Sequence, residues 1–200
     1  MFPRHRFDAL TDGLFGVAMT LLVLEVRLPD AADPHTTREL LDLLAGLSPK
    51  FWPYVLSFAV LGARWRDLVK GRSSHGEVSR RYINWGLAYL LLVTLVPFTT
   101  MVLGRFGSLP PAVWLYSANL AGMAICAWRL WAALPPAERD RQGEVSVGVV
   151  VFLLSAGLAV GFSFMHTAWA CLAFLLNAIT PAAERFVRSR RAGPARDAAA

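Results

Sequence analysis

Residues 6–25 read RFDALTDGLFGVAMTLLVLE, and this stretch decides which class of fold the chain can adopt. Its centre, Leu14–Leu24, contains no charged residue, and Glu25 follows it directly. An apolar run of this kind predicts a helix over about residues 7–28 whose centre lies in a bilayer. We expect Pro29 to end the helix, because proline has no backbone N–H to donate.

The composition of the whole chain points in the same direction. Of its 200 residues, 56% are hydrophobic and 17% are charged, whereas an ordinary globular chain has about 25% charged residues. A soluble protein of this size could not bury so much apolar surface, and lipid removes the need to do so. Only two cysteines are present, both within apolar stretches, so we expect no disulfide framework, no thiolate metal site and no cofactor.

Further apolar runs follow the first. We expect five more membrane helices, at about residues 50–69, 82–103, 111–134, 145–162 and 166–179. Pro97 is expected to kink the third span. Before the second span, Thr37–Leu47 has the leucine spacing of a short amphipathic helix at the membrane surface. The predicted fold is all-α, a polytopic membrane protein with about six transmembrane helices in a single repeat. Residues 1–183 would form the transmembrane domain, and residues 184–200 a basic, disordered cytoplasmic tail.

The basic residues predict the orientation of these spans. The formal charge is +6, and the positive charges gather between the apolar runs, which is typical of topology signals rather than of a nucleic-acid surface. With the N-terminus inside, 16 of the 20 Lys and Arg residues fall on the inner side. We therefore expect both termini in the cytoplasm and a multi-pass protein of the cell membrane, with the lipid bilayer and no nucleic acid as partner. Because Asp8 and Asp12 interrupt the N-terminal segment, we expect it to be retained rather than cleaved as a signal peptide.

One face of the first predicted helix carries an apolar stripe. Four residues recur at the spacing of one helical face, with a glycine in line one turn earlier: Val17, Thr20, Leu21 and Leu24, and Gly13. The commoner interpretation of such a stripe is packing between helices. The alternative is a pore wall made by several copies of the helix, with an aliphatic constriction that excludes water and a ring of Thr20 hydroxyls. The spacing alone leaves both open.

The same helix carries a motif that resembles a known family. The motif residues are Arg6, Leu10, Thr11, Asp12 and Gly13, and the helix closes on LLVLE at residues 21–25. This pattern is similar to the first-helix signature of the transmembrane protein 175 family of potassium channels, in its prokaryotic, single-repeat members. In that signature an arginine and three further residues precede Phe-Ser-Asp. Residues 52–58 (WPYVLSF) and 95–100 (LVPFTT) resemble the second and third helices of the family.

The chain departs from the family pattern at several positions. Leu10 stands where the motif has Phe, and Gly86 stands where we expect a polar Asn in the third helix. Residues 64–66 read RWR, where the family often has His. Val17 is smaller than the usual Ile or Leu, which predicts a wider constriction.

The resemblance implies a function and a set of site residues. It implies a homotetramer that conducts potassium passively and with moderate selectivity, with the first helix of each subunit lining a central pore. The implied constriction consists of Val17, Thr20, Leu21 and Leu24. Arg6, Thr11 and Asp12 would join the pore helix to its neighbours. Glu25 would either form a negative ring at the outer mouth or pair with Arg27 or a lipid headgroup. We expect no enzyme activity, and no metal beyond potassium ions in transit.

Two other classes of function remain as rivals. A small secondary transporter, or a proton-leak pathway of the inner membrane, is the first alternative. A transporter would need inverted repeats and broken helices, of which Pro97 is the single hint. A membrane enzyme would need clustered ionisable groups or metal ligands, and beyond the first helix the predicted spans nearly lack deep ionisable residues.

Overall fold

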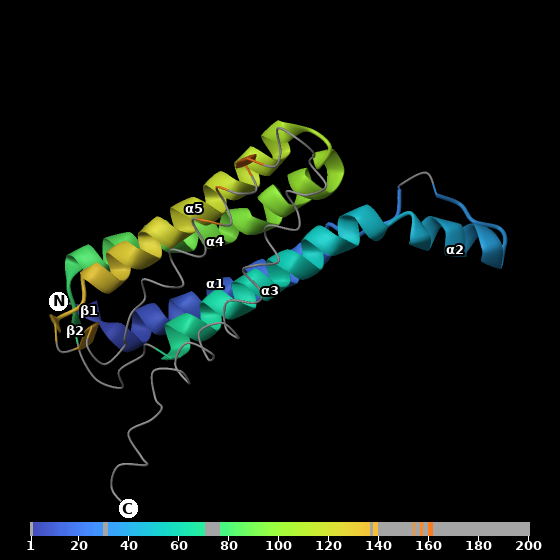
Figure 1. The fold of residues 1–200 in the computed structure, drawn as a ribbon. Coiled ribbons are helices and arrows are strands. Elements are labelled where there is room, and N and C mark those ends of the chain that lie inside the picture. The colour runs from blue at the N-terminus through green and yellow to red at the C-terminus, as the bar shows by residue number, and fades with distance from the viewer. Residues whose placement is uncertain are drawn as a thin grey trace, which may run out of the picture.

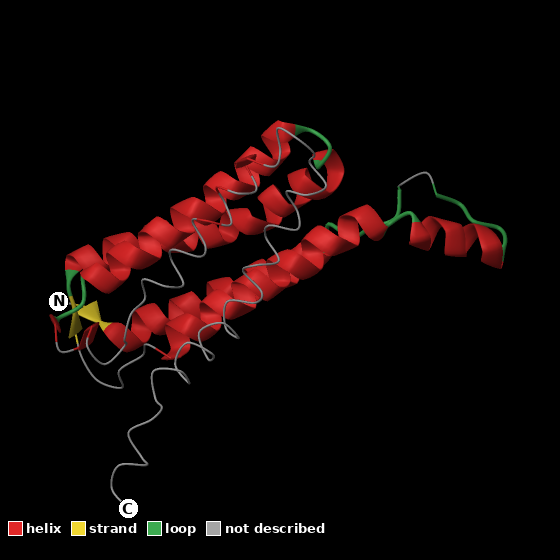
Figure 2. Cartoon of the chain, in the orientation of Figure 1, coloured by secondary structure: helices red, strands yellow, loops and turns green. Residues whose placement is uncertain are grey.

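The computed structural model of the chain describes residues 2–29, 32–70, 77–136 and 138–139, together with positions 154, 157, 160 and 161. Within this part the chain forms helices and one pair of short strands (Figure 2). In chain order these are β1 (Phe2–Pro3), α1 (Arg4–Val23), α2 (Thr37–Ala45), α3 (Ser48–Lys70), β2 (Glu77–Val78), α4 (Arg80–Phe106) and α5 (Pro110–Ala132). Apart from the four separate positions, the predicted fifth and sixth spans and the tail lie outside the described residues.

Helix α4 holds the described bundle together, because it contacts α1, α3 and α5. Figure 1 shows α4 and α5 as an antiparallel pair, with α1 and α3 running beside them. The bounds of α3, α4 and α5 each lie within three residues of the prediction. The fold of the described part is therefore all-α, as predicted, apart from the short strand pair.

Among the described helices, α4 is the one that is both long enough and apolar enough to cross a membrane by these two criteria. Half of its most apolar window is buried inside the protomer. Its buried side includes Tyr89, Leu90, Val93 and Val96, which face the other helices. The kink predicted at Pro97 and the full number of spans stay predictions.

Helix α1 ends earlier than predicted. We expected it to continue to about residue 28, and it ends at Val23. The chain then tightens into turns, in which the N–H of Glu25 donates to the Leu22 carbonyl at 3.3 Å. Arg27 Nε donates to the Leu24 carbonyl at 3.1 Å and so satisfies an acceptor at the helix end. Pro29 restricts only the residue directly before it, so the end at Val23 comes from these turns and not from the proline.

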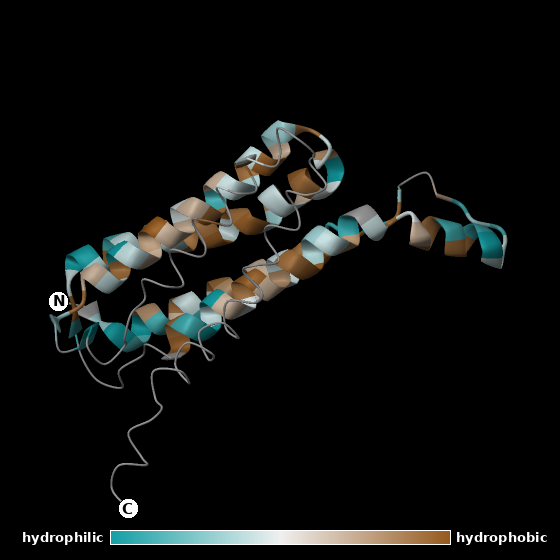
Figure 3. Cartoon of the chain, viewed as in Figure 1, coloured by the Kyte–Doolittle hydropathy of each residue, from teal (hydrophilic) through white to brown (hydrophobic). Residues whose placement is uncertain are grey.

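Helix α2 confirms the predicted amphipathic segment. Thr36 caps its N-terminus: the Thr36 hydroxyl accepts from the Glu39 N–H at 3.2 Å, and the Glu39 carboxylate reaches back to the cap. Hydrogen bonds to that carboxylate, first from the His35 N–H at 2.8 Å and then from Thr36, lower the pKa of Glu39. No residue of α2 is buried. Figure 3 shows hydrophobic and hydrophilic residues together on α2, which lies beyond the N-terminal end of α3.

The strand pair was not predicted. Phe2 pairs with Val78 and Pro3 with Glu77 in an antiparallel register. Each strand has two residues, too few to show the alternation by which strands are recognised in a sequence. The pair joins the start of α1 to the segment before α4.

The core lies among α1, α3, α4 and α5. Its largest fully buried side chains include Phe15, Leu61, Leu90 and Tyr116, one from each of these helices.

Close contact between α1 and α4 depends on Gly86. A Cβ at that position would lie 2.2 Å from Cζ of the Phe7 ring, so the absence of a side chain makes room for Phe7. The departure from the expected Asn at this position thus has a packing reason.

Candidate functional site

Helix α1 has two faces with opposite surroundings. Its buried residues are Arg4, Thr11, Phe15, Ala18 and Leu22. The predicted stripe lies on the other side of the helix: Val17 is 52% exposed, Leu21 42% and Leu24 57%, and Thr20 is exposed as well. Within the described part of the chain, the helix therefore packs through one face and leaves the other uncovered.

The glycines of α1 lie on the uncovered side. A Cβ added at Gly13 or at Gly16 would meet no atom within 4 Å. Packing within the described part of the protomer therefore does not require glycine at either position. Small residues let helices approach closely in membranes, so both positions suit contact with a helix of another chain.

Thr20 is the one polar side chain within the predicted stripe. Its hydroxyl donates to the Val17 carbonyl at 2.8 Å, one turn earlier in the same helix. This bond uses the hydroxyl hydrogen and leaves the oxygen lone pairs available. An oxygen presented in this way can act as a ligand for a cation.

Glu25 lies just beyond the stripe and is partly buried. Within the described part of the chain, its Oε2 atom is buried without a hydrogen-bond partner. The Arg27 guanidinium does not pair with Glu25 there, because Arg27 Nε donates to the Leu24 carbonyl instead. The backbone carbonyl of Arg27 accepts from Lys50 Nζ at 3.3 Å.

The predicted motif connects α1 to α3 through its aspartate. Trp65 Nε1 donates to Asp12 Oδ1 at 2.8 Å, so the RWR stretch that departs from the family pattern supplies the partner. Thr11 is buried, and its hydroxyl donates to the Phe7 carbonyl at 2.9 Å within the same helix. Leu10 and Arg6 are exposed. The structure therefore brings one motif residue, Asp12, into a hydrogen bond with a neighbouring helix.

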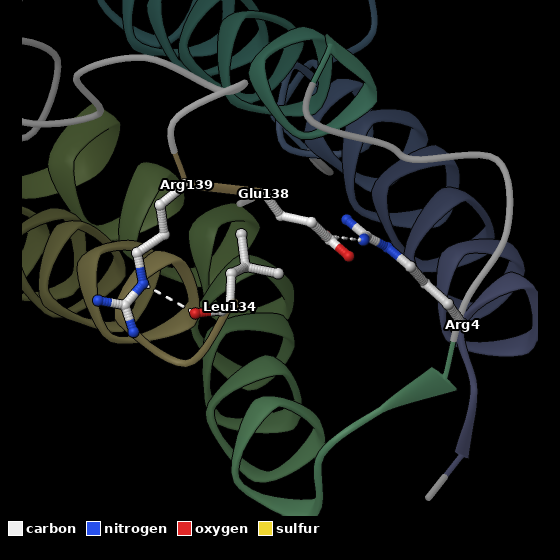
Figure 4. A network of polar contacts seen from close by, with 4 residues as sticks. All are labelled: Arg4, Leu134, Glu138 and Arg139. Atoms are coloured by element: carbon white, nitrogen blue, oxygen red, sulfur yellow. Dashed lines mark hydrogen bonds and ion pairs between the residues drawn. The ribbon is translucent and has the colours of Figure 1, made fainter. Parts of the chain in front are cut away.

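Arg4, which the sequence indicated merely as a topology charge, makes a polar contact with a residue far along the chain. It is buried at the start of α1, and its terminal nitrogen lies 2.7 Å from Glu138 Oε2, beyond the end of α5 (Figure 4). Its Cζ lies 5.8 Å from the centroid of the Tyr82 ring on α4. The two charged partners are 134 positions apart, so no local pattern could have identified the pair.

A buried group of hydroxyls between α3, α4 and α5 was also not predicted. Ser57 Oγ lies 2.9 Å from the Tyr116 hydroxyl, and Thr100 donates to Ser57 Oγ at 2.7 Å. Thr100 Oγ1 also lies 2.7 Å from the Val96 carbonyl of its own helix, and its single hydrogen serves one of these two acceptors at a time. These are interhelical contacts of the kind that hold membrane helices in register. In the described part of the chain, no group of three or more His, Cys, Asp or Glu residues is placed to hold a metal ion.

Comparison with known proteins identifies the relatives of the chain. Residues 6–97 match the model of a family described as the endosomal/lysosomal potassium channel TMEM175. A potassium channel of Chamaesiphon minutus is 31% identical over 137 residues, 67% of each chain. A potassium channel of Streptomyces collinus is 29% identical over 170 residues, 77% of this chain and 81% of its own.

A solved structure supports the same relationship. The crystal structure of a lysosomal potassium-selective channel TMEM175 homolog from Chamaesiphon minutus superposes with a TM-score of 0.76 at 26% identity. The match covers 90% of this chain and 96% of that one. These matches define the class: the chain is a helical membrane protein of the ion-channel type, and this class is not one of enzymes. Within the class, the chain belongs to the TMEM175 family of potassium channels.

Proposed function

We propose that four copies of this chain assemble around a common axis as a passive, moderately selective potassium channel of the cell membrane. Each chain crosses the membrane six times and keeps both termini in the cytoplasm. Residues 1–183 form the channel domain and residues 184–200 a basic tail. The observation that carries the proposal is the uncovered apolar stripe of α1, whose opposite face is fully engaged in the protomer core.

The stripe has the length and chemistry of a hydrophobic constriction. From Val17 to Leu24 it rises by about 10 Å along the helix. Four copies would place aliphatic rings at Val17, Leu21 and Leu24 around the axis and exclude water from a narrow neck. Potassium is less strongly hydrated than sodium, so the partial dehydration that such a neck imposes opposes potassium less. Within this neck, the Thr20 oxygen replaces part of the lost hydration.

The rest of the motif supports the position of the pore helix. The bond between Asp12 and Trp65 fixes α1 against α3 near the middle of α1, about three turns before Leu24. Arg6 and Leu10, both exposed in one protomer, contact the neighbouring copy, and Gly13 allows the helices to approach each other there. Glu25 adds a negative ring at the outer mouth, which raises the local concentration of cations.

Ion flux through liposomes tests the proposal. Full-length protein reconstituted into potassium-loaded vesicles should pass potassium faster than sodium, at rates beyond those of a carrier. Leu24→Ala should change the ratio of potassium to sodium flux by several-fold. The matched control is Leu91→Ala on α4, because Leu91 is also an exposed leucine (63%) but lies outside the stripe. That variant should leave the flux unchanged.

Several outcomes would refute the proposal. Equal effects of the two leucine substitutions would remove the special role of α1. A slow, saturable flux coupled to a proton or sodium gradient would favour the secondary transporter instead. Subunit counting by native mass spectrometry supplies an independent check, since a protomer or dimer cannot form the proposed fourfold neck.

A further inference from the structure

The guanidinium group of Arg129 lies over two indole rings. Arg129, in the last turn of α5, places its Cζ 5.3 Å from the centroid of the Trp85 ring on α4. The Trp128 ring on its own helix lies at 5.1 Å. Stacking on aromatic faces positions the planar guanidinium without using any of its N–H donors. Those donors are therefore left for another partner.

The two helices that hold Arg129 offer it no acidic partner. Neither α4 nor α5 contains an Asp or Glu. Within the described part of the chain, the Nε atom of Arg129 is buried without a hydrogen-bond partner, and no carboxylate forms an ion pair with this side chain. Leaving a buried donor of a charged group unbonded is unfavourable. Within the residues described, no acceptor meets this guanidinium, which is therefore available to an acceptor from another molecule.

Helix capping does not account for Arg129, because another arginine performs it. Arg139 Nε donates to the Leu134 carbonyl at 2.8 Å, and its terminal nitrogen donates to the Ala132 carbonyl. Its Cζ also lies 5.6 Å from the centroid of the Trp131 ring. Arg139 thus bonds the carbonyls at the end of α5, and the donors of Arg129 remain unused by them.

The location of Arg129 suits a phospholipid headgroup. A helix of 23 residues such as α5 is about 35 Å long, slightly more than the ~30 Å hydrocarbon core. In the proposed six-span topology, which this argument rests on, a residue in the last turn of α5 lies in the headgroup layer, where tryptophan is enriched. Trp128 is exposed at this position. Arg81 lies one turn before Trp85 on α4 and adds positive charge. Figure 1 shows the end of α5 beside the start of α4.

We propose that Trp85, Trp128 and Arg129 form a binding site for the phosphodiester group of an anionic phospholipid. The two indoles hold the guanidinium fork flat, so that it can give two parallel N–H···O bonds to the phosphate oxygens. Arg81 contributes a second positive charge. This lipid site is separate from potassium conduction and rests on α5 crossing the membrane as in the proposed topology.

Counting of bound lipid tests the site. Full-length protein in detergent is supplied with phosphatidylglycerol or phosphatidylcholine, and retained lipid is counted by native mass spectrometry. Wild-type protein should retain phosphatidylglycerol in preference, and Arg129→Gln should lower that retention by at least about fivefold. Arg129→Lys, which keeps the charge but not the planar fork, should fall between the two. The matched control is Arg105→Gln, since Arg105 is an exposed arginine in the last turn of α4 at the opposite end. It should retain lipid like the wild type.

A substitute variant and a soluble-anion control complete the lipid-binding test. If Arg129→Gln does not fold by circular dichroism, Trp128→Leu takes its place, because Trp128 is exposed and its loss removes one stacking face. Unchanged phosphatidylglycerol retention in the folded variant would overturn the proposal, as would an equal loss in Arg105→Gln. Inorganic phosphate is added alone in millimolar amounts in a thermal unfolding assay. Stabilisation equal to that by phosphatidylglycerol would assign the site to a soluble anion and overturn the lipid assignment.

Discussion

The two faces of α1 can be separated by a pair of neighbouring leucines. Leu22 is fully buried in the protomer, whereas Leu21, the preceding residue, is 42% exposed. Both substitutions to alanine remove the same atoms from the same turn of helix. Differences between the two variants must therefore arise from the surroundings of each side chain rather than from its chemistry or from helix propensity.

The magnitude follows from what each leucine contacts. In a water-soluble core, Leu→Ala costs about 3–5 kcal/mol, of which part is transfer from water and part is the cavity left behind. Lipid tails are as apolar as leucine, so the transfer part largely disappears in a membrane and the cavity part remains. We therefore expect Leu22→Ala to lower the free energy of unfolding by about 1–3 kcal/mol. Leu21→Ala leaves no cavity inside the protomer and should change it by less than about 0.5 kcal/mol.

The assay is unfolding in mixed micelles with increasing dodecyl sulfate, followed by the near-ultraviolet signal of the tryptophans. The same two variants are then reconstituted for potassium flux. Leu22→Ala should shift the unfolding midpoint, and Leu21→Ala should instead alter flux at an almost unchanged midpoint. If Leu21→Ala is as destabilising as Leu22→Ala, or if it leaves flux unaltered, then the exposed face does not line a pore and the reasoning fails.

Three further predictions concern contacts of named residues. Trp65→Phe keeps an aromatic ring but removes the hydrogen-bond donor to Asp12. We expect weaker potassium flux, with the fold retained as measured by circular dichroism. Flux equal to that of the wild type would contradict a supporting role for the bond. Gly86→Ala drives a methyl group into the ring that faces it from α1, and should lower the free energy of unfolding by about 1–3 kcal/mol in the same micelle assay. The pKa of Glu39 lies below its ordinary value of 4.5, chiefly because the backbone N–H of His35 donates to its carboxylate. The capped start of α2 is therefore stabilised above pH 4.5 and loses that stabilisation as the pH falls through the lowered pKa. Hydrogen exchange of the first turn of α2, corrected for its intrinsic pH dependence, should accelerate over that range in the wild type and stay independent of pH in Glu39→Gln.

Elements whose signals are local could be predicted closely. The bounds of α2 follow from leucine spacing and from Thr36 and Glu39, which lie three residues apart and cap each other. The end of α1 was predicted too late, because the helix does not reach the proline but ends where turns and Arg27 satisfy its last carbonyls. Such a termination depends on how side chains fold back on the chain, and a hydrophobic pattern does not contain that information.

In the candidate site, too, the sequence predicted the local features and the packing decided the rest. Periodicity was enough to place Val17, Thr20, Leu21 and Leu24 on one face of a helix, because a side-chain repeat is a geometric property of the helix itself. It could not decide which apolar face is buried. Leu22 and Leu24 are the same residue two positions apart, and one is fully buried while the other is 57% exposed.

Composition and hydrophobic runs were sufficient to predict a helical membrane protein, and the first-helix motif was sufficient to indicate this channel family, because these signals lie in contiguous residues. The tertiary structure alone decided which partners meet across the bundle. Arg4 reaches Glu138 from 134 positions away, and Arg129 lies over indoles of two different helices. Each of these contacts exists only once the helices have packed, since packing sets the distance between side chains that the chain itself keeps far apart.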